Sequence, residues 1–219
     1  MYLKKILKFL ILFFIIYQLF IILISIYTFL YKYFIASEVN FVERYGEDTW
    51  ACITGCSSGQ GKQFALKLAE RKFNILLIGR KGIYDVENII KEKYNVKTKC
   101  IVKDFFNSFK KNFFNDIKLF IESNNFAILI NNVGHRTAWK PYHEMPEKLI
   151  KNTISVGTLV QARMIQLVIP KFLERSKTKK SAIINITAQC MHPNIGFGVS
   201  NEISVPFLSA YEATNAFGF

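Results

Sequence analysis

Residues 50–61 read WACITGCSSGQG, an apolar run followed by a glycine-rich turn. A helical pattern then runs from Lys62 to Lys72, so a strand, a turn and a helix succeed one another. In such a unit one glycine permits the tight turn, one lets the backbone approach a pyrophosphate, and one lets helix and strand pack closely. Backbone N–H groups at the helix N-terminus then face the phosphates. The stretch predicts the first half of a dinucleotide-binding unit.

Strand-like and helical segments alternate along the rest of the chain after this turn. The apolar runs predict strands at 50–53, 74–78, 97–102, 127–130 and 181–186. Helical patterns lie at 86–94, 105–123 and 147–174, the last with Pro170 as a point of interruption. Strands that alternate with helices predict an α/β fold of the Rossmann type, a doubly wound parallel sheet covered on both faces.

An uncharged apolar segment precedes this predicted domain. Residues 9–30 read FLILFFIIYQLFIILISIYTFL, which is long enough to span the hydrocarbon core of a bilayer. A signal peptide has a shorter apolar stretch and a small-residue cleavage site, and neither is evident. We therefore expect one N-terminal transmembrane helix, with residues 1–45 as membrane anchor and linker and 46–219 as the folded domain. Lysines flank the segment on both sides, so the side of the membrane on which the domain lies stays open.

Composition narrows the classes of partner. The formal net charge is +13, but the basic residues are scattered and no nucleic-acid motif occurs. Membrane proximity and a coding bias explain this charge better than nucleic-acid binding does. The cysteines and histidines lack the spacing of metal ligands or of a disulfide framework, so we expect no metal. These residues are Cys52, Cys56, Cys100, Cys190, His135, His143 and His192.

Three motifs in order resemble the short-chain dehydrogenase/reductase family: TGCSSGQG at 54–61, NNVG at 131–134 and YEATN at 211–215. The resemblance covers roughly residues 45–219. The apolar N-terminus, YGEDTWACITG at 45–55, KNTISVG at 151–157 and QLVIP at 166–170 are most similar to one branch. That branch holds the membrane-bound very-long-chain 3-oxoacyl-CoA reductases and 17-beta-hydroxysteroid dehydrogenases.

The resemblance implies a membrane-anchored enzyme of the endoplasmic reticulum that reduces the ketone of a lipid substrate with NADPH. It leaves open whether that substrate is a steroid or an acyl-CoA. A homodimer or partners from a fatty-acid elongation complex are further expectations. They come from the resemblance alone.

The resemblance also implies a set of cofactor-binding residues. Arg80 stands where an NAD-specific enzyme carries an acidic residue for the ribose 2′-hydroxyl, and an arginine there suits a 2′-phosphate, which favours NADPH. A solvated arginine at a strand end is the alternative. Asp104 and Asn131 match adenosine-side positions of the family, and Asn215 stands within reach of a ribose. The complete predicted cofactor set is Gly55, Ser57, Ser58, Gly59, Gly61, Arg80, Asp104, Asn131 and Asn215.

The catalytic positions depart from the family pattern. Tyr211 matches the proton donor and Asn152 the asparagine that holds a water, but Asn215 replaces the lysine four residues after the tyrosine. Without that positive charge the main reason for Tyr211 to ionise easily is lost. The family's serine falls on Thr187 or on Ala188, depending on where a residue is missing. The resemblance implies Tyr211, Asn152 and Thr187 as the catalytic set.

Three further features bear on this region. About ten residues more than the usual spacing precede Tyr211, within 192–206, and Ser200 and Ser204 lie there. The sequon at 185–187 falls on a predicted core strand, which favours a structural Asn185 over a glycosylated one. The chain ends at Phe219 inside the helix that carries Tyr211, so the predicted domain is C-terminally incomplete.

The sequence therefore leaves two alternative functions. One is an NADPH-dependent ketone reductase with a divergent or incomplete active site. The other is a catalytically inactive relative that binds a nucleotide or acts as a scaffold.

Overall fold

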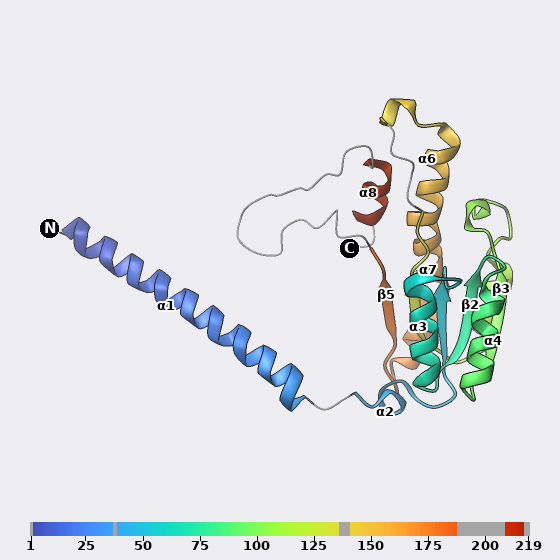
Figure 1. Cartoon of the computed structure of the whole chain (residues 1–219), viewed down its shortest axis with the longest axis horizontal. Coiled ribbons are helices and arrows are strands. Elements are labelled where there is room, and N and C mark those ends of the chain that lie inside the picture. The colour runs from blue at the N-terminus through green and yellow to red at the C-terminus, as the bar shows by residue number, and fades with distance from the viewer. Residues whose placement is uncertain (1, 37–38, 136–140, 188–208, 217–219) are drawn as a thin grey trace. The chain divides into compact units, whose positions relative to one another are not determined.

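The computed structural model describes residues 2–36, 39–135, 141–187 and 209–216 (Figure 1). The chain forms two compact units, 1–40 and 41–219. The predicted domain boundary, between residues 45 and 46, stays a prediction. Helix α2 (Phe41–Tyr45) belongs to the second unit by its packing, because the rings of Phe41 and Tyr45 both meet the ring of Phe73 edge-on.

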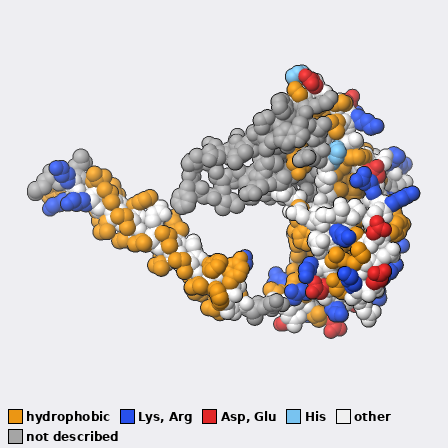
Figure 2. All heavy atoms as spheres, in the orientation of Figure 1, with side chains coloured by type: hydrophobic (Ala, Val, Ile, Leu, Met, Phe, Trp, Pro, Cys, Tyr) orange, Lys and Arg blue, Asp and Glu red, His pale blue; other side chains and the backbone are white. Residues whose placement is uncertain are grey.

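The first unit is one long apolar helix. Helix α1 (Tyr2–Leu30) contains the predicted segment 9–30 and continues as a π-helical turn, Tyr31–Ile35. Its hydrophobic side chains are exposed, and they cover most of the face that Figure 2 shows. Among the described residues, two helical stretches are long and apolar enough to cross a membrane, 4–35 and 147–175. The second is a core helix of the folded unit, because it packs against the sheet.

The second unit is built on a five-stranded parallel sheet. Its strands are β1 (Trp50–Thr54), β2 (Asn74–Gly79), β3 (Thr98–Val102), β4 (Phe126–Asn131) and β5 (Ala182–Asn185). They lie in the order β3-β2-β1-β4-β5, each pair parallel. The chain winds outward from β1 first to one side and then to the other, which confirms the predicted doubly wound fold.

Helices cover both faces of this sheet (Figure 1). They are α3 (Gly59–Glu70), α4 (Ile83–Lys93), α5 (Asn115–Glu122) and α7 (Val160–Arg175). Side chains of a strand alternate between faces, so neighbours in sequence enter different cores. Ile53 and Leu77 pack with α3 and α4, whereas Cys52 and Leu76 pack with α5 and α7. Strands buried on both sides explain the uninterrupted apolar runs in the sequence.

Two predicted helices differ from the structure. The segment 105–123 forms a 3₁₀ turn, Phe105–Asn107, and only the short helix α5, because Asn112 adopts a left-handed φ of 63° that interrupts a helix between them. Pro170 lies inside the continuous helix α7 and does not interrupt it. The interruption falls earlier, where α6 (Glu147–Ile154) widens into a π-helical segment, Ser155–Leu159.

This π-helical segment supports the last described helix, α8 (Ser209–Ala216). Gly157 lies directly against Thr214 of α8: a Cβ at residue 157 would be 2.5 Å from the Thr214 Cβ. Only a residue without a side chain permits this approach. The helix that carries Tyr211 is thus seated on the widened turn that follows Asn152.

Candidate cofactor site

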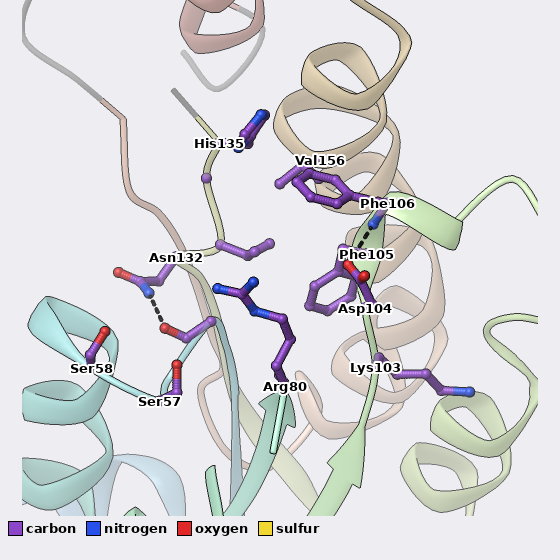
Figure 3. Close-up of a pocket in the computed structure, with 14 residues that line it drawn as sticks. Ser57, Ser58, Arg80, Lys103, Asp104, Phe105, Phe106, Asn132, His135 and Val156 are labelled. Carbon is purple, nitrogen blue, oxygen red and sulfur yellow. Dashed lines mark hydrogen bonds between the residues drawn. The ribbon is translucent and has the colours of Figure 1, made fainter. Parts of the chain in front are cut away.

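A cleft of about 510 Å³ opens at the carboxyl ends of the parallel strands (Figure 3). In a doubly wound sheet this edge is where ligands bind, at the point where the strand order reverses beside β1. The segments that follow β1, β2, β3 and β4, together with one residue of the π-helical turn, contribute its described lining. These residues are Gly55, Ser57, Ser58, Gly79, Arg80, Lys103, Asp104, Phe105, Phe106, Asn132, Val133, Gly134, His135 and Val156.

The three glycines of the turn have three different surroundings. Gly55 adopts a φ of 68°, and a Cβ there would lie 2.8 Å from Val133 Cα. Gly59 adopts a φ of 56° and has nothing within 4 Å of its Cβ position, so the space above it is open. At Gly61 a Cβ would lie 2.6 Å from the carbonyl oxygen of Gly55. Tight turn, open approach and close packing are the three uses of glycine in a phosphate-binding turn.

The start of α3 faces this open space. Ser58 precedes the helix in an extended conformation, and its side chain makes no capping hydrogen bond to the helix. The first N–H groups of α3 therefore have no side-chain acceptor from the N-cap residue. A helix N-terminus of this kind favours a phosphate, because its N–H groups and its dipole both attract negative charge.

Asn132, the residue directly after β4, braces the turn. Its amide Nδ2 donates to the carbonyl oxygens of Thr54, at 3.1 Å, and Gly55, at 3.0 Å. The Thr54 hydroxyl in turn accepts from the backbone N–H groups of Asn132 and Val133. Asn132 lines the cleft, and sequence reasoning missed it in favour of Asn131. The asparagine doublet at the end of the predicted strand was a signal that could have indicated Asn132. Successive side chains of a strand point to opposite faces, so only one of the two asparagines can point toward the glycine turn.

Arg80 is the cationic side chain that enters the cleft. It follows the last residue of β2, is exposed, and points up between Asn132 on one side of the cleft and Asp104 on the other (Figure 3). Lys103 follows β3 but points away, where it forms an ion pair with Asp116 at 2.9 Å. Asp104 accepts a hydrogen bond from the Phe106 backbone N–H at 3.2 Å, which fixes the turn after β3.

Asn131 is not among the described residues of this lining. Asn131 is buried beneath it, and its amide donates to Asn185 Oδ1 on β5 at 3.0 Å. Its predicted role at the adenosine stays a prediction. The same hydrogen bond gives Asn185 a place in the sheet, in line with a structural asparagine. Asn215 lies in the last turn of α8.

The predicted catalytic residues lie on three separate elements. Asn152 is on α6, Tyr211 is on α8, and Thr187 follows β5. Helices α6 and α8 pack against each other, so Asn152 and Tyr211 lie on neighbouring helices. Their roles stay predictions. Ala188, Ser200 and Ser204, as well as the extra residues at 192–206, lie outside the described residues.

The described cysteines are packing residues rather than reactive thiols. Burial raises the pKa of the Cys56 thiol to about 12 and that of Cys52 well above its ordinary value. Both thiols are therefore neutral at physiological pH, and a neutral thiol is a poor nucleophile and ligand. Over the described ranges, no group of three or more histidine, cysteine, aspartate or glutamate side chains could hold a metal ion.

Comparison with known sequences agrees with this geometry. The sequence model of a family described as short chain dehydrogenase matches residues 49–199. The very-long-chain 3-oxoacyl-CoA reductase of Rattus norvegicus is 35% identical over 179 residues, which cover 80% of this chain and 52% of that protein. The Homo sapiens protein of the same name is 32% identical over 198 residues, covering 88% of this chain and 58% of the relative. The chain thus spans about half the length of the curated relatives it matches.

Solved structures show the same fold. The short-chain dehydrogenase from Sphingobium yanoikuyae, in complex with NADPH, superimposes with a TM-score of 0.64 at 22% sequence identity. The match covers 77% of this chain and 61% of that one. At this identity the likeness concerns the fold.

Proposed function

Because the chain belongs to the short-chain dehydrogenase family, we propose that it is a membrane-anchored oxidoreductase that reduces the ketone of a lipid substrate with NADPH. The observation that carries the proposal is the cleft that combines the glycine turn with the exposed Arg80. A dinucleotide fits the turn, and the arginine selects the form with a 2′-phosphate. The 3-oxoacyl-CoA and steroid ketones are the substrate classes that the resemblance supports.

The residues of the cleft fit NADPH in detail. The pyrophosphate would lie over Gly59, where a Cβ meets nothing within 4 Å and the N-terminus of α3 is open. Ser57 and Ser58 flank this position with hydroxyl groups. Arg80 would hold the 2′-phosphate, and a guanidinium suits that task because it donates several hydrogen bonds in a planar fork. When bound, NADPH supplies the hydride that reduces a carbonyl.

The lipid substrate and the membrane location rest on two other observations. Helix α1 and its π-helical extension offer 32 residues, 4–35, of sufficient length and hydropathy to cross a bilayer. Several relatives that are 32–36% identical are named very-long-chain 3-oxoacyl-CoA reductases. A substrate with a long acyl chain partitions into membranes, so an anchor would bring the cleft to its substrate. The endoplasmic reticulum is the membrane that the resemblance implies.

One observation favours a second function, a cofactor-binding relative that does not catalyse reduction. Asn215 stands four residues after Tyr211, where the family has a lysine. A neighbouring cation lowers the pKa of a phenol, and an asparagine supplies no charge for this. A proton donor with an unassisted pKa transfers its proton less readily near neutral pH.

The two functions separate in a single set of measurements on the full-length protein in detergent micelles. NADPH binding is followed by cofactor fluorescence, and reduction of a long-chain 3-oxoacyl-CoA by loss of NADPH absorbance. Arg80→Ala should weaken NADPH about 10- to 100-fold and leave NADH unchanged. Turnover by the unmodified chain supports the reductase, and turnover that requires Asn215→Lys supports the inactive relative. Absence of NADPH binding in the unmodified chain overturns both.

A further inference from the structure

One polar atom in the wall of the cleft has no partner. The Nε2 atom of His135 is buried, yet it makes no hydrogen bond within the part of the chain that the structure describes. The imidazole as a whole is half-buried and lines the cleft. A buried polar atom without a hydrogen bond is unfavourable, and in native proteins such atoms are rare. At the wall of a ligand cleft, the ligand is the natural partner.

The ring of His135 is held in place by an aromatic neighbour. The imidazole and the ring of Phe106 are nearly perpendicular, with centroids 4.8 Å apart and planes at 78°. Phe106 belongs to the turn after β3 and is itself partly exposed, at 37%. The pair therefore forms a wall that joins the segment after β4 to the segment after β3 (Figure 3).

The position of this wall indicates which part of a dinucleotide it meets. Arg80, after β2, stands where the adenosine ribose and its 2′-phosphate bind. The phosphates lie toward α3, on the β1 side, so the base must lie beyond the ribose toward β3. Phe106 follows β3, and the charge of Arg80 reaches His135, where it lowers the imidazole pKa in addition to the effect of burial. His135 thus stands at the adenosine end although it follows β4.

We propose that His135 is a binding residue for the adenosine half of the cofactor, to which its Nε2 atom makes a hydrogen bond beside the Phe106 ring. The inference rests on the proposed binding of NADPH. In this assignment His135 binds the uncharged adenosine, and Arg80 binds the 2′-phosphate. An exposed aromatic ring beside the histidine suits a purine, because bases stack on aromatic side chains.

Three ligands and three variants test this assignment on the full-length protein. The ligands are NADPH, NADH and adenosine 2′,5′-bisphosphate, which carries the adenosine and its 2′-phosphate but no nicotinamide. The variants are His135→Ala, His135→Gln and Arg80→Ala. Glutamine places an amide group near the position of Nε2, so it keeps a hydrogen-bonding atom there, whereas alanine does not. Dissociation constants come from cofactor fluorescence and, for the bisphosphate, from calorimetry.

The expected pattern differs between the two residues. His135→Ala should weaken all three ligands by a similar factor, about 3- to 10-fold, because the lost hydrogen bond is to their shared adenosine. His135→Gln should restore most of the affinity for each. Arg80→Ala should weaken NADPH and the bisphosphate but not NADH. A loss of thermal stability in His135→Ala that glutamine restores without restoring affinity would assign His135 a structural role and overturn the inference.

Other outcomes also decide the matter. An effect of His135→Ala on both dinucleotides but not on the bisphosphate would place the residue at the nicotinamide half and overturn the inference. An effect on NADPH and the bisphosphate but not on NADH would make it a phosphate ligand, with the same consequence. Failure of the unmodified chain to bind any of the three ligands overturns the proposed function and this assignment with it. If the unmodified chain binds the ligands and neither His135 variant changes their affinity, the assignment of His135 is overturned but the proposed function is not.

Discussion

The glycine turn and the predicted catalytic residues lie in parts of the domain that are constructed differently. The turn at 54–61 is enclosed by buried strands and held by direct hydrogen bonds from Asn132. Asn152 lies on α6, Thr187 in the segment after β5 and Tyr211 on α8, and these three segments depend on long-range packing for their relative positions. Cofactor recognition uses backbone shape, which a short motif encodes, whereas proton transfer needs side chains brought together from distant segments.

The largest effect is expected where the backbone itself forms the site. Gly55→Ala adds a Cβ that would lie 2.8 Å from Val133 Cα, at a φ of 68°. Left-handed strain and crowding together should lower the free energy of unfolding by about 3 kcal/mol and abolish NADPH binding. Urea unfolding and cofactor fluorescence measure the two effects.

Gly134→Ala is the matched control in the same cleft. Nothing lies within 4 Å of the Cβ position of Gly134, and its φ lies outside the left-handed region. We expect the free energy of unfolding of this variant to change by less than about 0.5 kcal/mol. Equal unfolding midpoints for the two variants would contradict the view that backbone shape at the turn dominates the site.

The same difference explains how much could be predicted from the sequence. The strands and the glycine turn were predictable, because unbroken apolar runs and glycine spacing are local signals. The helix predicted at 105–123 was wrong in its first part, since helical spacing of phenylalanines does not reveal that Asn112 adopts a φ of 63°. His135 and Phe106 meet only because the strand order brings the ends of β3 and β4 to one edge. No local pattern encodes that contact.

A second prediction separates the two asparagines of the doublet. Asn132→Ala removes the donor to two carbonyl groups of the turn and should lower the free energy of unfolding by about 2 kcal/mol. NADPH affinity should fall about tenfold, because the turn loses its brace. Asn131→Ala breaks the hydrogen bond to Asn185, and this bond involves no residue of the glycine turn. A larger loss of NADPH affinity in Asn131→Ala than in Asn132→Ala would restore Asn131 as the cofactor residue.

A third prediction concerns a link between the two regions. The buried hydroxyl of Ser155, in the π-helical segment, donates to the Phe105 carbonyl at 3.1 Å and also bonds the Ser108 hydroxyl. This ties the turn after β3 to the helix that carries Asn152. Ser155→Ala leaves both partners buried without it and should cost about 1–2 kcal/mol of unfolding free energy.

Ser123→Ala serves as the control for this link. Its hydroxyl also donates to a backbone carbonyl, that of Leu119, but in an exposed position. Water can replace that bond, so the expected change is below about 0.5 kcal/mol. Similar losses in both serine variants would show that the buried link does not join the two regions more strongly than a surface hydrogen bond does.

The smallest expected effect is a pH dependence that originates in the cleft. Burial, and then the charge of Arg80, lowers the pKa of His135 below its ordinary value of 6.5. The unfolded chain therefore takes up this proton at a higher pH than the folded chain does. The contribution of His135 to stability is complete above about pH 6.5 and is lost as the pH falls through the window down to its folded pKa.

Unfolding free energies at pH 7 and pH 5, compared between the unmodified chain and His135→Gln, isolate this contribution. The unmodified chain should lose more stability on acidification, by less than about 1 kcal/mol, because the imidazole is only half-buried. The Arg80→Gln variant should lose less stability between pH 7 and pH 5 than the unmodified chain does, since the substitution removes one of the two causes of the lowered pKa of His135. Identical pH dependence in all three proteins would contradict the buried environment of the imidazole beside Phe106, from which the ligand contact of Nε2 is inferred.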